Sequence, residues 1–210
     1  MSVHGRCKKF LLPAAAKKRV IVGGYSPAIH VLPREFLATG TVIGINRWGA
    51  ELPCDYWIGL DTGMNWRKYH SQEHHPELPK FLRTLKAPKF MRLPNKDSEQ
   101  FVPADAGIFF EKAHAGKIPT EWDGTLQFQS STAMAAINLA IILDAEEIVL
   151  YGVDFVGHER ADGSEYTVPN IWDQHKHEIN SLVRRFNELV PVFKTHPDSW
   201  LDCEFMEVTA

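Results

Sequence analysis

The 210-residue sequence has little cysteine and no long apolar run. Its three cysteines (Cys7, Cys54 and Cys203) lie far apart and form no CxxC pair. This scarcity disfavours a disulfide framework or a cysteine-based zinc site, and we expect a reducing, cytoplasmic location. The longest apolar stretch, residues 133–143, is too short to cross a membrane and contains Asn138, so no membrane span is predicted.

Several motifs that bind metals or nucleotides are also missing. The sequence contains no GxGxxG, no P-loop, no HExxH and no Asp-x-Asp pair, and neither a repeat nor a linker divides it. His70 and His74 have the i,i+4 spacing of metal ligands, but Pro76 interrupts the segment, and an exposed loop is the preferred interpretation. We therefore expect one domain without a metal ion or other cofactor.

The net charge of −3 is unevenly placed along the chain. The first 19 residues carry six basic and no acidic residues, whereas the other 17 basic and 26 acidic residues give the remainder a charge of −9. The sequence thus divides into a basic arm, residues 1–18, and a domain, residues 19–210. A frayed, solvated terminus explains the arm, and binding of an anionic or phosphate-rich partner is the functional alternative.

Short β-rich runs alternate with helical segments along the domain. Strands are expected at residues 20–22, 41–45, 56–60, 89–93, 147–151 and 191–194, and helices at 27–37, 131–143 and 172–189. This alternation predicts parallel strands joined by right-handed crossovers. The predicted class is therefore α/β: a single Rossmann-like, doubly wound, mostly parallel sheet with helices on both faces.

Ligands of such sheets bind beyond the carboxyl ends of the strands. Small and polar residues recur there, in the segments 24–27, 46–48, 61–65, 154–166 and 196–199. The first of these reads Gly24-Tyr25-Ser26-Pro27. Glycine lets a ligand approach the backbone closely, and the start of the helix that follows offers N–H groups to a phosphate. A plain tight turn is the alternative interpretation.

Three further positions suggest binding or catalysis. Asn46 closes the second strand and can both donate and accept hydrogen bonds, although a turn residue would look the same. Ser131 and Thr132 open the Ala-rich helix, where a hydroxyl caps the helix or binds an anion or a sugar hydroxyl. A histidine at the start of the last helix, beside Asp173 or Glu178, could serve as a general base whose tautomer the carboxylate fixes. A histidine on a charged helix surface is the alternative.

Taken together, these segments resemble the bacterial sialyltransferases of glycosyltransferase family 42 and, more distantly, motility-associated and pterin-pyrophosphokinase-like Rossmann proteins. The likeness covers roughly residues 19–201. Its landmarks, in order, are Gly24 with Pro27, Asn46, Ser131-Thr132, Gly152-Val153-Asp154-Phe155, Gly163-Ser164-Glu165-Tyr166, and Pro197 with Ser199 and Leu201.

The resemblance implies a variant of the GT-A fold and an inverting, metal-independent transfer of a sugar from a nucleotide-sugar, which is CMP-linked in that family, to an acceptor hydroxyl. By position, the donor contacts would be Gly24, Tyr25, Ser26, Pro27, Asn46, Ser131, Thr132, Asp154 and Ser199. Tyr166 would stabilise the leaving phosphate. His175, or failing that His177, would deprotonate the acceptor, although an alignment without a gap puts Asp173 at that position. Val156 or Gly157 stands where the family has a first tyrosine.

Two other functional classes stay open on the sequence. Transfer of a diphosphoryl group from ATP to a small heterocycle, as in the pterin-type relatives, would need Mg²⁺. A nucleotide-binding module without catalysis would need no base. The acceptor is equally open: a glycan, or a modified nucleobase in DNA that the basic arm and Trp48 would contact, although Trp48 is more typical of a core residue. A homo-oligomer is compatible with the sequence.

Overall fold

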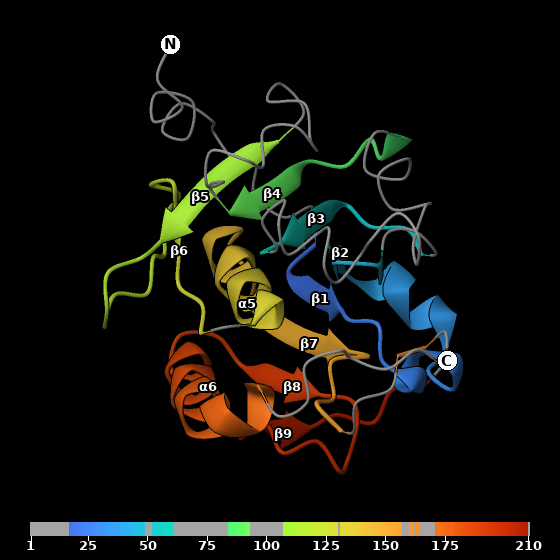
Figure 1. The fold of residues 1–210 in the computed structure, drawn as a ribbon. Helices are drawn as coiled ribbons and strands as arrows, with labels where there is room; N and C mark the ends of the chain where they lie inside the picture. The colour runs from blue at the N-terminus through green and yellow to red at the C-terminus, as the bar shows by residue number, and fades with distance from the viewer. Residues whose placement is uncertain are drawn as a thin grey trace.

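The computed structural model describes residues 17–48, 52–60, 84–92, 107–129, 131–156, 160–161, 163 and 171–209, apart from the side chains of residues 109 and 171–173. Within these residues nine strands form one sheet in the order β6-β5-β4-β3-β2-β1-β7-β8-β9, and every pairing is parallel (Figure 1). The strands are β1 (Arg19–Gly23), β2 (Thr41–Ile45), β3 (Tyr56–Gly59), β4 (Lys89–Arg92), β5 (Ile108–Lys112), β6 (Thr125–Leu126), β7 (Glu147–Tyr151), β8 (Val192–Lys194) and β9 (Glu204–Phe205). The predicted Rossmann-like α/β class is confirmed.

The central strands are short apolar runs because both of their faces are covered. In β1, β2, β3 and β7 nearly every residue is buried. Parallel strands that pack on both sides are characteristically rich in Val and Ile rather than alternating with polar residues. This composition made the six predicted strands recognisable.

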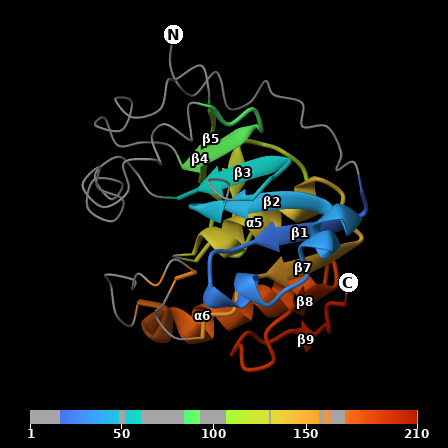
Figure 2. The ribbon, with the colours of Figure 1, turned by 90° about the vertical axis from the view of Figure 1, so that its right-hand side faces the viewer.

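The two faces of the sheet carry different kinds of helix. On one face lie α5 (Thr132–Ile142) and α6 (Ile171–Asn187), which contact each other. The other face is packed by two 3₁₀ helices, η1 (Pro27–His30) and η2 (Arg34–Thr39), which lie in front of the sheet in Figure 2. The β1–β2 and β7–β8 connections run in opposite directions along the sheet, so right-handed crossovers put them on opposite faces.

The single helix expected at residues 27–37 is wrong in detail. The chain forms η1, then a turn, and then η2, with Pro33 as the residue that precedes η2. Proline has no N–H to donate and disfavours helical geometry in the residue before it, so an α-helix cannot run through Pro33.

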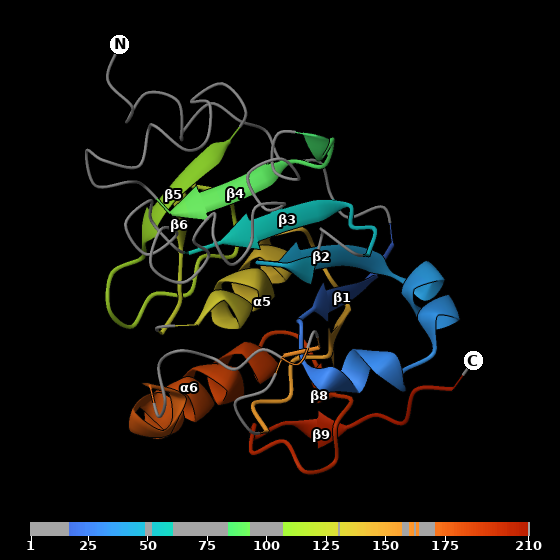
Figure 3. The same cartoon turned by 45° about the vertical axis from the view of Figure 1, so that its right-hand side comes forward.

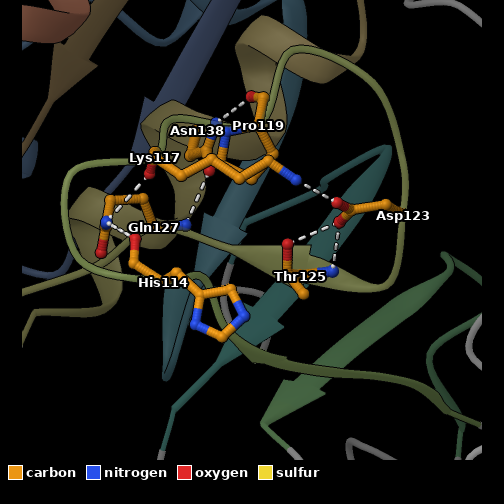
Figure 4. A network of polar contacts seen from close by, with 7 residues as sticks. All are labelled: His114, Lys117, Pro119, Asp123, Thr125, Gln127 and Asn138. Carbon is orange, nitrogen blue, oxygen red and sulfur yellow. Dashed lines mark hydrogen bonds and ion pairs between the residues drawn. The ribbon is translucent and has the colours of Figure 1, made fainter.

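The larger core cluster lies between the sheet and the two α-helices. Nine of the eleven residues of α5 are buried, including the polar Asn138, which is 0% exposed. Its amide donates to the Pro119 carbonyl oxygen at 2.7 Å and accepts from the Gln127 N–H at 2.7 Å (Figure 4). The Gln127 side chain in turn donates to the carbonyl oxygens of His114 and Lys117. This network fixes the loop between β5 and β6 against α5.

The last residues of the basic stretch contact the body of the domain. Lys18 Nζ lies 2.8 Å from Asp144 Oδ2, and Arg19 Nε lies 2.6 Å from Glu147 Oε1. The hydrogen bond from Lys18 to Asp144 is the main reason that the pKa of Lys18 is raised. Lys18 and Arg19 therefore meet acidic residues of this chain. In the described residues, no helix has the length and apolarity that crossing a membrane requires.

Candidate functional site at the carboxyl edge of the sheet

The sheet reverses its winding direction between β1 and β7. Strand β1 pairs with β2 on one side and with β7 on the other, so the turns after β1 and β7 lead away from each other. Such a switch point opens a crevice at the carboxyl edge, where open α/β sheets bind their ligands. In Figure 3 the arrowheads of β2, β3 and β4 point to the side on which α6 begins, so the start of that helix lies at the same edge.

Gly24 and Gly152 bring the two turns into contact at the switch point. The Gly24 N–H donates to the Tyr151 carbonyl oxygen at 2.8 Å, and the Ser26 N–H donates to the Gly152 carbonyl oxygen at 3.2 Å. A Cβ on Gly24 would lie 2.4 Å from the Gly152 oxygen, and a Cβ on Gly152 would lie 2.4 Å from Ile29 Cγ2. Gly152 also has a φ of +65°, a conformation that glycine adopts readily. Both positions therefore need glycine.

The other predicted residues of this turn have structural partners. Ser26 Oγ accepts a hydrogen bond from the Ala28 N–H at 3.3 Å and so caps η1, in which Pro27 is the first residue. Tyr25 is 7% exposed and belongs to the core cluster under η1 and η2. The side chains of Ser26 and Tyr25 therefore have structural roles. The backbone of the turn is the part that a ligand at the crevice would contact.

Asn46 and Arg47 follow β2 at the neighbouring position on the same edge. Asn46 adopts a φ of +49°, and its carbonyl oxygen accepts a hydrogen bond from Trp57 Nε1 at 2.7 Å. Its side-chain Oδ1 is buried, and in the described part of the chain no group donates a hydrogen bond to it. Arg47 is only 5% exposed. The next residue, Trp48, is fully buried, as expected for a core residue.

Asp154 lies just beyond β7 and is 7% exposed. Its Oδ1 accepts a hydrogen bond from the Val156 N–H at 3.3 Å. Between these residues Phe155 adopts a φ of +54°, which is unusual for a bulky side chain. The Phe155 ring packs against Trp200 with 5.0 Å between the ring centroids. The buried Asp154 carboxylate is thus held at the crevice by a tight turn, which the contact between Phe155 and Trp200 stabilises.

The start of α5 also lies near this edge. Ser131 precedes the helix in an extended conformation and is 6% exposed, but its hydroxyl makes no capping hydrogen bond, and Thr132 is the first helical residue. The first N–H groups of a helix have no partner within the helix and carry a partial positive charge. This end of α5 therefore suits an anion or a hydroxyl.

His175 and Glu178 meet one turn into α6. Nδ1 of His175 lies 2.5 Å from Glu178 Oε2, and Gln129 Nε2 donates to the same oxygen at 3.1 Å. The hydrogen bond from His175, followed by that from Gln129, lowers the pKa of Glu178. Because Gln129 lies just before α5, this contact joins the starts of the two helices.

The two candidate histidines lie on different sides of α6. His175 lies on the same side of α6 as the core residues Ile179, Leu182 and Phe186. The four residues are separated by four, three and four positions, the intervals that place side chains on one side of an α-helix. Its side chain is 31% exposed. His177 is offset by two positions and is exposed, so it points to another side of the helix. Of these two histidines, His175 is the one that continues the inward side of α6 toward the carboxyl edge.

Ser199 follows β8 and is 4% exposed. Its hydroxyl accepts a hydrogen bond from the Leu201 N–H at 3.4 Å, and its carbonyl oxygen accepts from Lys194 Nζ at 2.6 Å. These bonds give Ser199 a role in shaping the turn. Tyr166, His70 and His74 lie outside the described residues, as does the side chain of Asp173. Within the described residues, no group of three or more metal-ligating side chains occurs.

Gln129 and Arg160 are not among the candidate residues that the sequence names, and the contact that Gly152 makes was not predicted. Gly152 was visible as part of a strand-ending motif, but its contact with Gly24 depends on the order of the strands. Gln129 follows β6, a two-residue strand with no apolar pattern. Arg160 is 7% exposed, and nothing in the sequence marks it as buried.

A hollow lies at the opposite, amino edge of the sheet. It has a volume of about 290 Å³ and is lined by Lys18, Arg19, Glu146, Glu147, Pro191 and Phe193. Two of its lining residues, Arg19 and Glu147, form an ion pair. Because its charged side chains pair with each other and the strands begin rather than end there, we assign the candidate site to the carboxyl edge.

No protein-family model and no curated protein matches the chain. Among solved structures, the chain is similar to a variant of the α-2,3/8-sialyltransferase CstII, with 12% sequence identity and a TM-score of 0.47. The match covers 91% of this chain and 88% of the sialyltransferase chain. A likeness of this degree does not decide an activity, so the function must be inferred from the residues of this chain.

Proposed function

We propose that the chain is a glycosyltransferase that moves a sugar from a nucleotide-sugar to an acceptor hydroxyl, with inversion and without a metal ion. His175 is the general base. The observation that carries this proposal is the contact between His175 Nδ1 and Glu178 Oε2, 2.5 Å long, at the end of α6 that lies at the carboxyl edge.

The contact with Glu178 defines which nitrogen of His175 is basic. The pKa of Glu178 lies below its ordinary value of 4.5, so its carboxylate is ionised at neutral pH as an unperturbed glutamate would be, and an ionised carboxylate only accepts hydrogen bonds. Nδ1 must therefore donate, and in the neutral imidazole the lone pair then resides on Nε2. Nε2 can take the proton of an acceptor hydroxyl as the new bond to the sugar forms.

The donor nucleotide would lie over the switch point. The glycine contact between the turns allows a ligand to approach the backbone closely, and Asp154 and Asn46 offer buried oxygens to hydroxyl groups of the ligand. The start of α5 presents N–H groups to the charge that develops on the leaving phosphate. Tyr166, in the role that the family resemblance implies, would add a hydroxyl donor. The resemblance alone suggests a CMP-linked donor.

The proposal is tested by release of nucleotide from a panel of nucleotide-sugars in EDTA, with water or added glycans as acceptors. We expect turnover without a metal ion and a loss of about 10²–10⁴-fold in His175→Gln. His177→Gln is the matched control, because it removes an exposed histidine two positions away, and it should retain turnover. Turnover that requires Mg²⁺ and ATP, or equal losses in the two variants, would contradict the proposal.

A further inference from the structure

The carboxylate of Glu178 accepts hydrogen bonds from two different parts of the chain. His175, one turn earlier on α6, has its Nδ1 2.5 Å from Glu178 Oε2. Gln129, which lies between β6 and α5, donates to the same oxygen from Nε2 at 3.1 Å. An ionised carboxylate only accepts hydrogen bonds, so the group of the Gln129 amide that faces it must be the NH₂. One oxygen atom thus joins the candidate base to a residue outside α6.

The contact within α6 is a weak restraint by itself. The side chains of His175 and Glu178 are 31% and 52% exposed, and pairs three residues apart on an exposed helix surface stabilise a protein very little. A glutamate side chain has several rotatable bonds and loses conformational entropy when it is fixed. Without another contact, water would compete for the carboxylate, and Glu178 would spend part of the time away from the His175 imidazole.

Gln129 supplies a restraint that comes from the core. The residues before it are fixed by buried contacts, since the Gln127 N–H donates to Asn138 Oδ1 at 2.7 Å and the Gln127 amide donates to the Lys117 carbonyl oxygen at 2.9 Å (Figure 4). Phe128 is 4% exposed, and its N–H donates to Gln127 Oε1 at 3.1 Å. The backbone that leads into Gln129 is therefore held in place, so its side chain starts from a fixed point.

The position of the carboxylate controls where the imidazole carries its proton. The hydrogen bond made by one nitrogen of a neutral histidine decides which of the two nitrogens is protonated. As long as Glu178 Oε2 faces His175 Nδ1, the proton stays on Nδ1 and the lone pair stays on Nε2. A histidine released from its carboxylate exchanges between the two tautomers, and the tautomer with a proton on Nε2 cannot accept one there from a hydroxyl.

We propose that Gln129 is a positioning residue: it holds the Glu178 carboxylate against His175 Nδ1 and so keeps the lone pair of the imidazole on Nε2. This inference rests on the proposed function, in which His175 is the base, and adds a residue that acts on the base through Glu178. Partners that orient a metal-binding histidine typically contribute about 10–100-fold to affinity or activity, and Gln129 is one contact further from the reacting atoms. Gln129→Met should therefore lower kcat by about 10-fold and change KM little.

The inference is tested by long-range ¹H–¹⁵N NMR of the histidine rings at about pH 8, where an ordinary histidine is neutral, because the correlation pattern shows which ring nitrogen is protonated. The spectrum of His175→Gln identifies the His175 signals. The unmodified protein should show the tautomer protonated on Nδ1. Gln129→Met, which keeps the length of the side chain without its donor, should show a mixture of both tautomers. The pKa of Glu178, which the hydrogen bonds from His175 and then from Gln129 lower, should move toward 4.5 in the same variant.

Gln174→Met is the matched control, because it makes the same exchange at an exposed glutamine next to His175. It should leave the tautomer and the Glu178 titration unchanged. Gln129→Lys supplies an ammonium donor in place of the amide and should restore the single tautomer. A Gln129→Met protein that keeps the tautomer, the Glu178 titration and kcat, with or without a loss of stability, would overturn the inference. That result would leave the proposed function intact, which fails instead if His175→Gln retains turnover.

Discussion

Replacement of Asn138 by alanine should destabilise the domain strongly, because it removes the two hydrogen bonds that tie α5 to Pro119, in the loop between β5 and β6, and to Gln127, which follows β6 (Figure 4). The Gln127 N–H and the Pro119 carbonyl oxygen would be left without partners in a buried region. The same segment continues to Gln129, which bonds to Glu178. The substitution therefore tests whether the network supports the candidate site.

The expected loss in the free energy of unfolding follows from the two backbone groups that would lose their hydrogen-bond partner, the Gln127 N–H and the Pro119 carbonyl oxygen. Each buried donor or acceptor left unsatisfied costs about 1–3 kcal/mol. Alanine returns about 0.5 kcal/mol through its higher helix propensity. The net loss in the free energy of unfolding should therefore be about 2–5 kcal/mol, measured by urea denaturation followed by circular dichroism.

Asn180→Ala is the matched control, since it makes the same exchange inside α6. The Asn180 amide bonds to the Trp200 carbonyl oxygen and to the Asp202 N–H, near exposed residues where water can replace it. We expect a change below about 1 kcal/mol there. Equal losses in the two variants, or less than about 1 kcal/mol for Asn138→Ala, would refute the reasoning.

Two further outcomes follow from the geometry of the site. Gly24→Ala should lower the free energy of unfolding by about 3 kcal/mol, because the added Cβ would press on the Gly152 backbone. Gly116→Ala is the comparison: Gly116 has a φ of +82° but open space around the added Cβ, so the loss should be about 1 kcal/mol. Glu178 should titrate in carbon-detected NMR below its ordinary pKa of 4.5 and return toward it in His175→Gln. Since the folded pKa is the lower one, the stability that Glu178 adds is present above pH 4.5 and is lost as the pH falls through the folded value. An unshifted Glu178, or equal costs for the two alanine substitutions, would contradict these expectations.

Much of the fold could be predicted because the central strands are apolar runs buried on both faces. The predicted strands at residues 41–45 and 147–151 coincide with β2 and β7. Strands β5, β6 and β9 were missed for separate physical reasons. Strand β5 ends in the charged pair Glu111-Lys112, β6 has two residues, and β9 is an exposed edge strand. None of them shows the buried pattern that identifies a parallel strand.

The sequence suffices to place a candidate site at the carboxyl edge of the sheet, but it does not predict the contacts within that region. Parallel strands bring their carboxyl ends to one edge whatever their order, so Asn46 and Asp154 could be selected as candidates from the chain alone. The contact between Gly24 and Gly152 depends on β1 lying next to β7. The bond from Gln129 to Glu178 depends on how the two helices pack, which periodicity does not encode.

The most direct test of a nucleotide site at the switch point is hydrogen–deuterium exchange with and without saturating nucleotide. Peptides covering residues 23–27, 131–135 and 152–155 should exchange more slowly when nucleotide is bound, while those covering the amino-edge hollow at Lys18 and Glu146 should not change. Protection confined to the amino edge, or unchanged exchange at the Gly24 turn under saturation, would contradict the account.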